Sequence, residues 1–537
     1  MRPQNEPVEL VFGLAGPVGT RFSKVTDTLK DALVAVSYST QTIRLSSFLP
    51  EYNLSDGKAT IELKNRPEDE RIRSHQDGGN ALRNAVGNKA ALAIRAIQEI
   101  AETRTLPPQR SAYVLHSLKR PEEVEQLRAV YDEGFFLIAV VAPRWLRIKS
   151  LAERIAETHE TADTAAWLGV AEELVQRDED EQSEYGQKLT DTFPSADLFV
   201  SFEDGSPIAL DRLTKQIHRF VQLIMGCTDH TPTREESAMF HAYGASLRSG
   251  DLARQVGAAI TSNSGDILSV GCNDVARAGG GIYWTGDHYD HRDIKHERGT
   301  AEIYEEKILN EIGDALPRET GTSEATTEDL GRTLSKTSIM GLLEFHRSLH
   351  AEMDALLAAG RNSTSVRGAD LFCTTFPCHE CAKLILGAGI RRVVYIEPYP
   401  KSQVAHMYQH EIATTDHRSV CTNCGDTRPP LEDEKHAKKC QTCASTVILY
   451  FDEDGRCTTC GEQHLARFVP FTGVGPRRYL ELFSLIIQGT RQKRKDHQGY
   501  RVPWQPAQRQ PMFPASYLQK ETLITEKIKP AFDAIKR

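Results

Sequence analysis

The sequence predicts an α/β protein with two folded parts. The first is an N-terminal parallel sheet covered by helices, and the second is an α/β/α domain that carries a small cysteine-rich insertion. Two observations predict this organisation. Apolar, strand-like runs alternate with helical patterns over the first 226 residues, as in parallel α/β sheets. Eight of the 11 cysteines form four CxxC pairs, and three of these pairs fall within residues 416–464.

Composition sets the outer limits. The chain has 537 residues, 39% of them hydrophobic and 26% charged, which is typical of a globular protein of several domains. Its net charge of −9 argues against a surface that binds nucleic-acid duplexes without specificity. The apolar run Phe135–Ala142 is far shorter than the roughly 18 residues that span a bilayer. We expect a cytoplasmic protein without a membrane partner, whose cysteine pairs bind metal.

The first domain is expected to cover residues 1–228. An apolar strand ends in glycines near Gly13 and is followed by a helix over Val25–Val36. A strand–helix–strand unit follows at Ser111–Ala142, and a last strand and helix lie within Ala196–Gly226. The polar segment after residue 226 favours a domain boundary there.

The glycine-rich turn after the first strand lies where a phosphate-binding loop belongs. Its pattern is degenerate, because Thr20-Arg21 stands where a P-loop has Lys followed by Ser or Thr. The amides of such a loop can still hold a phosphate, and a bound nucleotide would bring Mg²⁺. In the alternative interpretation, the glycines only turn the chain. The predicted phosphate-binding residues are Gly13, Gly16, Gly19 and Thr20.

The segment after this loop resembles the later half of a P-loop nucleotide kinase. The resemblance rests on Arg120, which follows a strand, and on Arg144, Arg147 and Arg154 in a helix. It implies a kinase-like fold for residues 1–228. Phosphoryl transfer is not expected, because the lysine that supplies positive charge in a P-loop is missing.

The second domain is expected to cover residues 229–480. Two β-rich runs flank Asn263–Asp266, which predicts a hairpin. Residues 278–335 are predicted to form an insertion that contains one helix. The other expected elements are helices at Glu235–Ser249, Ala301–Ile312, Ser348–Ala359 and Cys378–Ala388, and strands at Asp370–Thr375 and Arg392–Glu397.

Two motifs in this domain carry the chemistry. His350 and Glu352 form an H-x-E motif, and Pro377, Cys378 and Cys381 belong to a P-C-x-x-C motif. Together they match the signature of zinc deaminases. One imidazole and two thiolates would hold Zn²⁺ with an open position for water, and Glu352 would transfer protons as the catalytic residue. The plainer alternative is a structural zinc site or no metal.

Residues 235–475 resemble a deoxycytidylate deaminase of the cytidine deaminase fold. The resemblance includes the run Arg254–Ala258 and the element Gly271-Cys272-Asn273, where Cys272 replaces the family's tyrosine. It implies that Asn273 binds the deoxyribose hydroxyl and that Arg254 also contacts the substrate.

The combination of a kinase-like domain and such a deaminase resembles the bacterial antiphage dCTP deaminases. That resemblance implies deamination of dCTP and of dCMP, which depletes the dCTP pool during infection. It also implies a homo-oligomer of even number and control by an inhibitory RNA or a phage-derived trigger. The competing hypotheses are a housekeeping dCMP deaminase, a deaminase of bases within nucleic acid, and a non-catalytic nucleotide sensor.

Residues 416–464 hold the remaining cysteine pairs, at spacings that favour a zinc ribbon or knuckles. The segment has little apolar content, so metal would supply much of its folding energy. Six thiolates can fill one site with two left over, or two sites if His436 and His464 join. A redox or partner-sensing module is the alternative, and residues 481–537 are expected to form a tail. The predicted structural zinc ligands are Cys421, Cys424, Cys440, Cys443, Cys457 and Cys460.

Overall fold

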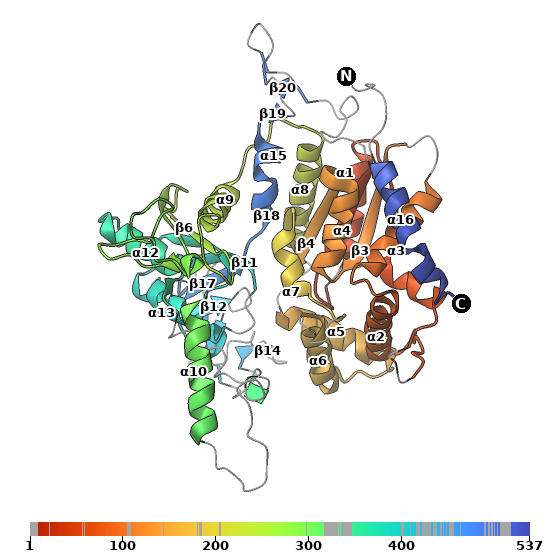
Figure 1. The fold of residues 1–537 in the computed structure, drawn as a ribbon, viewed down its shortest axis with the longest axis horizontal. Coiled ribbons are helices and arrows are strands. Elements are labelled where there is room, and N and C mark those ends of the chain that lie inside the picture. The colour runs from red at the N-terminus through yellow and green to blue at the C-terminus, as the bar shows by residue number, and fades with distance from the viewer. Residues whose placement is uncertain are drawn as a thin grey trace. The chain divides into compact units, whose positions relative to one another are not determined.

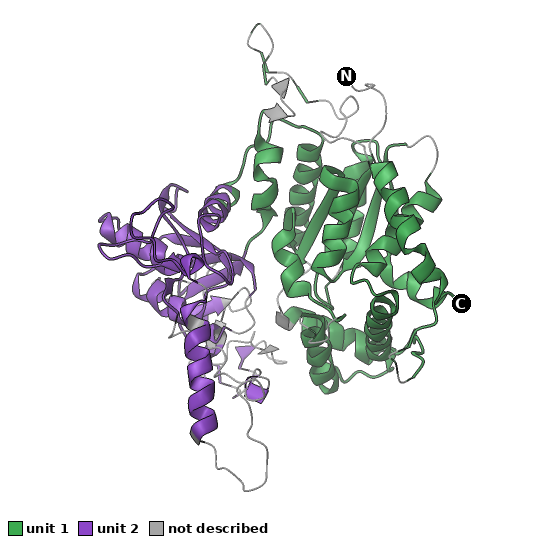
Figure 2. Ribbon diagram, in the orientation of Figure 1, with its two compact units in different colours: residues 1–236, 471–537 green, residues 237–470 purple. Residues whose placement is uncertain are grey.

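The computed structural model of the chain forms two compact units, which are described separately (Figure 2). Unit 1 comprises residues 1–236 and 471–537, and unit 2 comprises residues 237–470. The described residues are 9–20, 22–55, 57, 59–104, 109–142, 144–179, 181, 185–202, 206–296, 298–315, 331, 333–334, 346–398, 402–408, 410–414, 419–421, 431–432, 438–440, 443, 445–446, 448–450, 456–461, 463–487, 490–491, 494–495, 498, 500–501, 503–504 and 517–537.

Unit 1 is built on a six-stranded sheet of order β18-β5-β4-β1-β3-β2 (Figure 1). Strands β1 to β5 are all parallel, and β18 is antiparallel to β5 at the edge. The predicted parallel α/β sheet is therefore confirmed. The strands are β1 (Leu10–Ala15), β2 (Ser39–Arg44), β3 (Ser111–Leu118), β4 (Phe135–Val141), β5 (Leu198–Ser201) and β18 (Gly473–Val474).

Helices cover both faces of this sheet, so its central strands are apolar on both sides. Alternate residues of β1, including Phe12 and Leu14, share one core with α1 and α8. Helix α3 contacts β3, and α4 contacts both α3 and β4. The helices are α1 (Phe22–Val34), α2 (Glu68–Val86), α3 (Ala91–Thr103), α4 (Pro121–Tyr131), α5 (Arg144–Thr158), α6 (Leu168–Glu179), α7 (Leu189–Thr192), α8 (Pro207–Ile224), α15 (Tyr479–Phe483) and α16 (Tyr517–Asp533).

The C-terminal segment, predicted as a tail over residues 481–537, contains elements that belong to unit 1. Residues 471–537 belong to unit 1, where β18 extends the sheet and α16 packs on α3 and α4. Buried ion pairs hold this segment, with Arg104 and Glu521 joined at 2.7 Å and Arg478 and Asp197 at 3.0 Å. These pairs join residues far apart in the chain, so local sequence patterns gave no sign of them.

Unit 2 contains a mixed six-stranded sheet of order β12-β17-β11-β10-β6-β7. Strands β10, β11, β17 and β12 are parallel, whereas β6 is antiparallel to both β10 and β7. The strands are β6 (Gly257–Thr261), β7 (Ile267–Cys272), β10 (Asp370–Thr375), β11 (Arg392–Glu397), β12 (Ile412–Thr414) and β17 (Ala466–Pro470). Three further strand pairs are β8 (Asp274–Val275) with β9 (Ser348–Leu349), β13 (Ser419–Cys421) with β16 (Ile448–Tyr450), and β14 (Leu431–Glu432) with β15 (Lys438–Lys439).

Two glycines show how the helices of unit 2 cover opposite faces of its sheet. A Cβ on Gly257 would lie 1.9 Å from the carbonyl oxygen of Ala242 in α9, and a Cβ on Gly271 would lie 2.3 Å from the amide of Ala355 in α12. Gly257 and Gly271 are on opposite faces, because Gly271 pairs with the residue after Gly257. The predicted α/β/α layering is confirmed. The helices are α9 (Arg234–Ser246), α10 (Thr300–Ala315), α12 (Ala351–Arg361), α13 (His379–Gly387) and α14 (Val404–Met407).

Most of the expected elements of unit 2 are present at nearly the expected positions. The hairpin between β6 and β7 turns at Asn263–Asp266, and β10 and β11 have the expected bounds. Helix α12 begins after His350 rather than at Ser348, because residues 348–349 pair with β8. None of the helices seen in the described parts of the chain combines the length and apolar character needed to cross a membrane.

Candidate active site

Each predicted catalytic metal ligand lies at the start of a helix in unit 2. His350 has the extended backbone of an N-cap residue and precedes α12, and Cys378 is the N-cap of α13. Cys381 lies in the first turn of α13, and its backbone amide donates to the Cys378 sulfur at 3.4 Å. Unpaired amides and the helix dipole at such a position favour thiolates.

The three predicted ligands converge on one point. The Nδ1 atom of His350 is 3.2 Å from the Cys378 sulfur and 3.3 Å from the Cys381 sulfur. All three ligand atoms lie within 4.8 Å of one another, and both cysteines are buried. One imidazole and two thiolates are the donors that zinc prefers, and three protein ligands leave a position for a reacting molecule. The residues therefore fit a catalytic zinc ion.

The protonation of the two thiols is coupled. A hydrogen bond from Cys381, together with His350, lowers the pKa of Cys378 to about 4. The same hydrogen bond, together with burial, raises the pKa of Cys381 well above its ordinary value. The hydrogen bond between the two sulfurs thus favours the thiolate at Cys378 and the thiol at Cys381. A zinc ion would displace the proton of that thiol, because only the thiolate is a good ligand.

Glu352 lies in the first turn of α12, with only 4% of its surface exposed. Burial raises the pKa of this carboxyl group, and the nearby His350 acts in the opposite direction. A carboxyl group with a raised pKa can both accept and donate a proton near neutral pH. Glu352 therefore has the environment of a general acid and base beside the predicted metal.

The two predicted substrate-binding residues have different environments. Both ends of the Asn273 amide bind backbone, because its Nδ2 donates to the carbonyl of Arg254 at 2.8 Å and its Oδ1 accepts from the amide of Val256 at 2.7 Å. The Arg254 side chain is about half exposed and forms an ion pair with Glu397. Asn273 thus shapes the segment that carries Arg254, and contact of either with substrate stays a prediction.

The sequence analysis did not select Glu397 and Thr375, which lie near Arg254 at the carboxyl ends of β11 and β10. The hydroxyl of Thr375 donates to Glu397 at 3.2 Å, and these residues end two neighbouring parallel strands. The signal was available, since parallel strands predicted at Asp370–Thr375 and Arg392–Glu397 have their carboxyl ends at the same edge.

The cysteine-rich segment forms two further clusters of metal-ligand type among the described residues. In the first, Cys421 and Cys443 have sulfurs 3.6 Å apart, and Cys440 lies close by. In the second, the Cys460 sulfur is 3.1 Å from Nε2 of His464, and Cys457 completes the group. Cys424 and His436 lie outside the described residues. The pairing that the sequence left open therefore joins Cys421 to Cys440 and Cys443, and the third pair to His464.

In the predicted phosphate-binding loop of unit 1, side chains of the protein itself bind backbone atoms of the loop. The carboxylate of Asp178, which is 1% exposed, accepts the backbone amide of Val18 at 2.7 Å and the ammonium of Lys119 at 2.6 Å. Lys119 also donates to the carbonyl oxygen of Gly16 at 2.9 Å. Asp178 thus lies where an anion would sit, and phosphate binding stays a prediction.

The other predicted loop residues have separate local roles. Gly13 lies inside β1, where a Cβ would approach a Leu118 methyl carbon to 2.4 Å, so it permits close packing. Gly19 has a φ of +89°, and a Cβ there would lie 2.7 Å from the Arg147 carbonyl oxygen. The buried hydroxyl oxygen of Thr20 has no hydrogen-bond partner among the described residues.

Comparison with known proteins agrees with the class that the site suggests. Residues 232–397 match the family described as the cytidine and deoxycytidylate deaminase zinc-binding region. This segment contains His350, Glu352, Cys378 and Cys381. Residues 232–397 are therefore similar to the zinc-binding region of cytidine and deoxycytidylate deaminases.

Several relatives carry the name deoxycytidylate deaminase. The chain is 46% identical over 55 residues to that of Enterobacteria phage T2, which is 10% of this chain and 29% of the phage protein. It is 47% identical over 47 residues to the human protein, which is 9% of this chain and 25% of the relative. "ComE operon protein 2" of Bacillus subtilis is 38% identical over 66 residues, which is 12% and 33%. The matches thus span a quarter to a third of these curated relatives.

Two solved structures overlap the chain weakly. One is a dCMP deaminase from the cyanophage S-TIM5 in complex with dCMP and dUMP, at 23% identity and a TM-score of 0.19, covering 34% of this chain and 93% of that one. The other is a gluconokinase from Sinorhizobium meliloti, at 13% identity and a TM-score of 0.22, covering 41% and 98%.

Proposed function

We propose that the protein is a zinc-dependent deaminase that converts deoxycytidine nucleotides, dCMP and dCTP, to the uracil nucleotides. The arrangement of His350, Cys378 and Cys381 around one point, with the buried Glu352 beside it, carries the proposal. A structural zinc site needs four protein ligands and no buried carboxylic acid. Among the described residues, this site offers three ligands together with the Glu352 carboxyl group, whose pKa is raised.

The residues have distinct roles in this reaction. When bound, zinc would lower the pKa of a water molecule toward neutrality. The role of Glu352 would be to accept a proton from the attacking water and to deliver protons to ring nitrogen N3 and to the departing amino group of cytosine. Uracil and ammonia are the products, so no oxidant or reductant is consumed. The burial of Glu352 keeps the transferred proton away from bulk water.

The nucleotide specificity rests on several observations. Relatives that are 46–47% identical over segments of 47 to 55 residues are named deoxycytidylate deaminases, which favours dCMP as a substrate. The Arg254 side chain is about half exposed, whereas its ion-pair partner Glu397, at the end of β11, is mostly buried. We propose that this guanidinium meets the substrate phosphate. We extend the proposal to dCTP, which carries the same base and sugar as dCMP.

The physiological part of the proposal is antiphage defence by depletion of dCTP. It rests on the resemblance of the two-domain architecture to antiphage dCTP deaminases. A housekeeping dCMP deaminase would need only unit 2, whereas this chain couples unit 2 to a complete parallel α/β unit. An even-numbered homo-oligomer, and an inhibitory RNA or phage-derived trigger, belong to the same proposal.

A substrate panel tests the proposal directly. Purified, zinc-loaded protein is incubated with dCTP, dCDP, dCMP, CTP, cytidine and single-stranded DNA, and products are identified by mass spectrometry. Glu352→Ala, checked for unchanged zinc content, is the matched control. Uracil product from dCMP or dCTP that disappears in the variant supports the proposal, and their ratio decides the phosphate preference.

Two results would overturn it. Product from single-stranded DNA alone would indicate a deaminase of bases within nucleic acid. If no substrate gives a product, and none does so in extract from phage-infected cells, the protein would be a non-catalytic nucleotide sensor. For the defence role, plaque counts on cells that express the wild type or Glu352→Ala must differ, and equal counts would reject it.

A further inference from the structure

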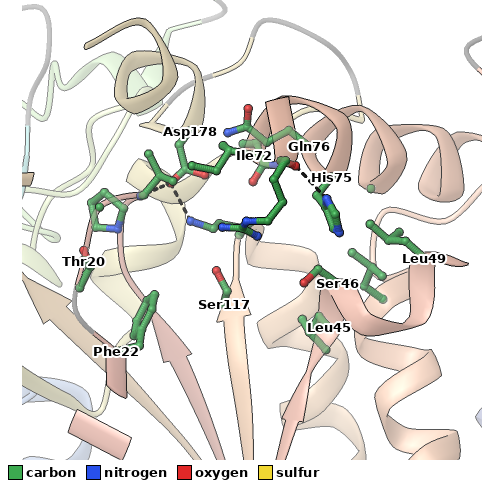
Figure 3. Close-up of a pocket in the computed structure, with 18 of the residues that line it drawn as sticks. Thr20, Phe22, Leu45, Ser46, Leu49, Ile72, His75, Gln76, Ser117 and Asp178 are labelled. Atoms are coloured by element: carbon green, nitrogen blue, oxygen red, sulfur yellow. Dashed lines mark hydrogen bonds and ion pairs between the residues drawn. The ribbon is translucent and has the colours of Figure 1, made fainter. Parts of the chain in front are cut away.

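We propose that unit 1 contains a separate binding site for a nucleoside, in which Gln76 recognises the base. The inference does not depend on the deaminase proposal, because every residue in it belongs to unit 1. The site is a cavity of about 220 Å³ between the loop after β1 and helix α2 (Figure 3). Such a volume is below the roughly 300–1,000 Å³ of pockets for drug-sized ligands, which favours a ligand about as large as a nucleoside.

The position of the cavity is the one where parallel α/β sheets bind ligands. The chain leaves β1 toward β2 and β3 on one side, and continues to β4 and β5 on the other. Thr20 follows β1, Ser46 follows β2 and Ser117 is the next-to-last residue of β3, and all three line the cavity. The crevice at the carboxyl ends of strands, where the strand order reverses, is the usual binding site of such sheets.

Gln76 is the observation that points to a ligand. Its side chain lines the cavity and is 6% exposed, yet neither its Oε1 nor its Nε2 has a hydrogen-bond partner among the described residues. Buried amides without partners are costly, so nearly all are satisfied in folded proteins. A ligand that offers one acceptor beside one donor would satisfy both atoms. The edge of a nucleobase presents that pair.

Other buried polar atoms of the lining also have no hydrogen-bond partner among the described residues, and two of them are neutral acceptors. These are Oε1 of Gln187, whose residue is 4% exposed, and the hydroxyl oxygen of Thr20. Ser117 adds backbone strain, because its φ is +75° at a bulge where β3 pairs with β1. Left-handed backbone in a residue other than glycine, and bulges near sheet ends, concentrate at binding sites. These groups could contact a sugar.

The apolar walls and the paired charges define the ligand further. Phe22, Leu45, Leu49, Ile72 and Leu92 provide flat apolar contact. Among the described lining residues, four cationic side chains form ion pairs: Arg71 and Arg154 with Glu68, Arg83 with Glu123, and Lys119 with Asp178. A free sugar would lack enough polar partners, and an amino acid would lack unpaired charges. A nucleoside fits both properties.

The same pairing predicts that phosphate groups add little to affinity. Lys119 and the Val18 amide, which would otherwise hold a phosphate, both bind the Asp178 carboxylate. An incoming phosphate would have to displace this buried carboxylate. The base and sugar therefore dominate recognition, and the nucleoside and its 5′-phosphates should bind within about tenfold of one another.

Calorimetry on the full chain tests the site. The background is Glu352→Gln, so that unit 2 does not convert the probes. Thymidine, deoxyuridine, deoxycytidine, deoxyadenosine and deoxyguanosine are titrated, each also as its 5′-monophosphate and triphosphate. We expect at least one nucleoside to bind, with at least tenfold loss in Gln76→Leu and no loss in Gln98→Leu, a half-buried glutamine on α3. Any binding at unit 2 is the same in both variants.

Two further readouts separate recognition from a structural role. Without ligand, Gln76→Leu should raise the melting temperature by about 2–4 °C, because it removes unpaired buried polar atoms. Gln76→Glu, which replaces the donor by a second acceptor, should change which nucleoside binds. The proposal is overturned if the Gln76 variants bind the whole panel as the wild type does, or if only triphosphates bind. A lower melting temperature of Gln76→Leu would also overturn the proposal, because it would show that the Gln76 amide stabilises the fold.

Discussion

The strand ends of the two units hold polar clusters that differ in one respect. In unit 1, the loop after β1 has its charges matched from within, since Asp178 accepts both the Val18 amide and the Lys119 ammonium. In unit 2, the Cys378 and Cys381 sulfurs have mainly each other and the His350 ring as partners. Two thiols and an imidazole do not form a charge-balanced pair, whereas a carboxylate and an ammonium group do. The first cluster is complete without a ligand, and the second needs a cation.

A sequence motif indicates a ligand site only when the polar groups of that site are left without partners in the folded chain. A glycine-rich turn after a strand indicates an anion site, but here the chain supplies the anion. Conversely, no sequence motif pointed to the cavity beside that turn, which is recognised from the buried Gln76 amide that has no hydrogen-bond partner in the described part of the chain. The decisive evidence is the set of polar atoms that remain unpaired after folding.

The largest expected effect is the loss of a metal ion from unit 2. We expect three zinc ions per chain, one for each cluster of metal ligands, and Cys378→Ala should remove one together with all measurable deamination. Cys457→Ala should also remove one zinc ion but leave deamination measurable. Metal analysis alongside the activity assay tests this, with Cys227→Ala, a cysteine outside the clusters, as control. Unchanged zinc in Cys378→Ala would show that this cluster is not a metal site.

The second prediction separates proton transfer from metal binding. Glu352→Gln keeps the size of the side chain but cannot shuttle a proton, so kcat for dCMP should fall by roughly 10²–10⁴. The zinc content should stay that of the wild type, because Glu352 is not a ligand. Steady-state kinetics and metal analysis of the same preparation measure both. A fall of less than tenfold would remove Glu352 from the proton transfer.

The third prediction concerns the self-paired cluster of unit 1. Asp178→Ala leaves the Lys119 ammonium and the Val18 amide without their shared partner, which should lower the free energy of unfolding by about 3 kcal/mol. The double variant Asp178→Leu/Lys119→Met removes both charges and should recover most of this loss. Denaturant titrations of the full chain, following the unfolding of unit 1, compare the three proteins. Equal stability of Asp178→Ala and wild type would mean that the pair contributes nothing.

The smallest expected effect is at Arg254. Arg254→Ala should raise KM for dCMP about tenfold, through loss of one charge-assisted hydrogen bond to phosphate. Deoxycytidine, which has no phosphate, should be affected much less. Arg298→Ala serves as the control, because Arg298 is an exposed arginine of unit 2 that pairs with Glu306. A similar loss for nucleotide and nucleoside would place Arg254 away from the phosphate.

Local chemistry explains which features the sequence could predict. Strands such as β10 and β11 were predicted to the residue, because apolar runs bounded by turns are local signals. The ligands His350, Cys378 and Cys381 were predicted from spacing, since each pair of motif residues lies within one turn of a helix start. Their meeting within 4.8 Å agrees with that spacing.

Contacts between residues distant in the chain decided the rest. The sequence by itself determined the two α/β parts, and it predicted the metal ligands and the catalytic carboxyl group, because these follow from short-range patterns. Only the tertiary structure placed β18 and α16 in unit 1 and brought His464 to Cys457 and Cys460. It also placed the carboxylate of Asp178, a residue of α6, against the glycine-rich loop. The physical reason is that buried charges and thiols choose partners by distance in space, and sequence separation does not record that distance.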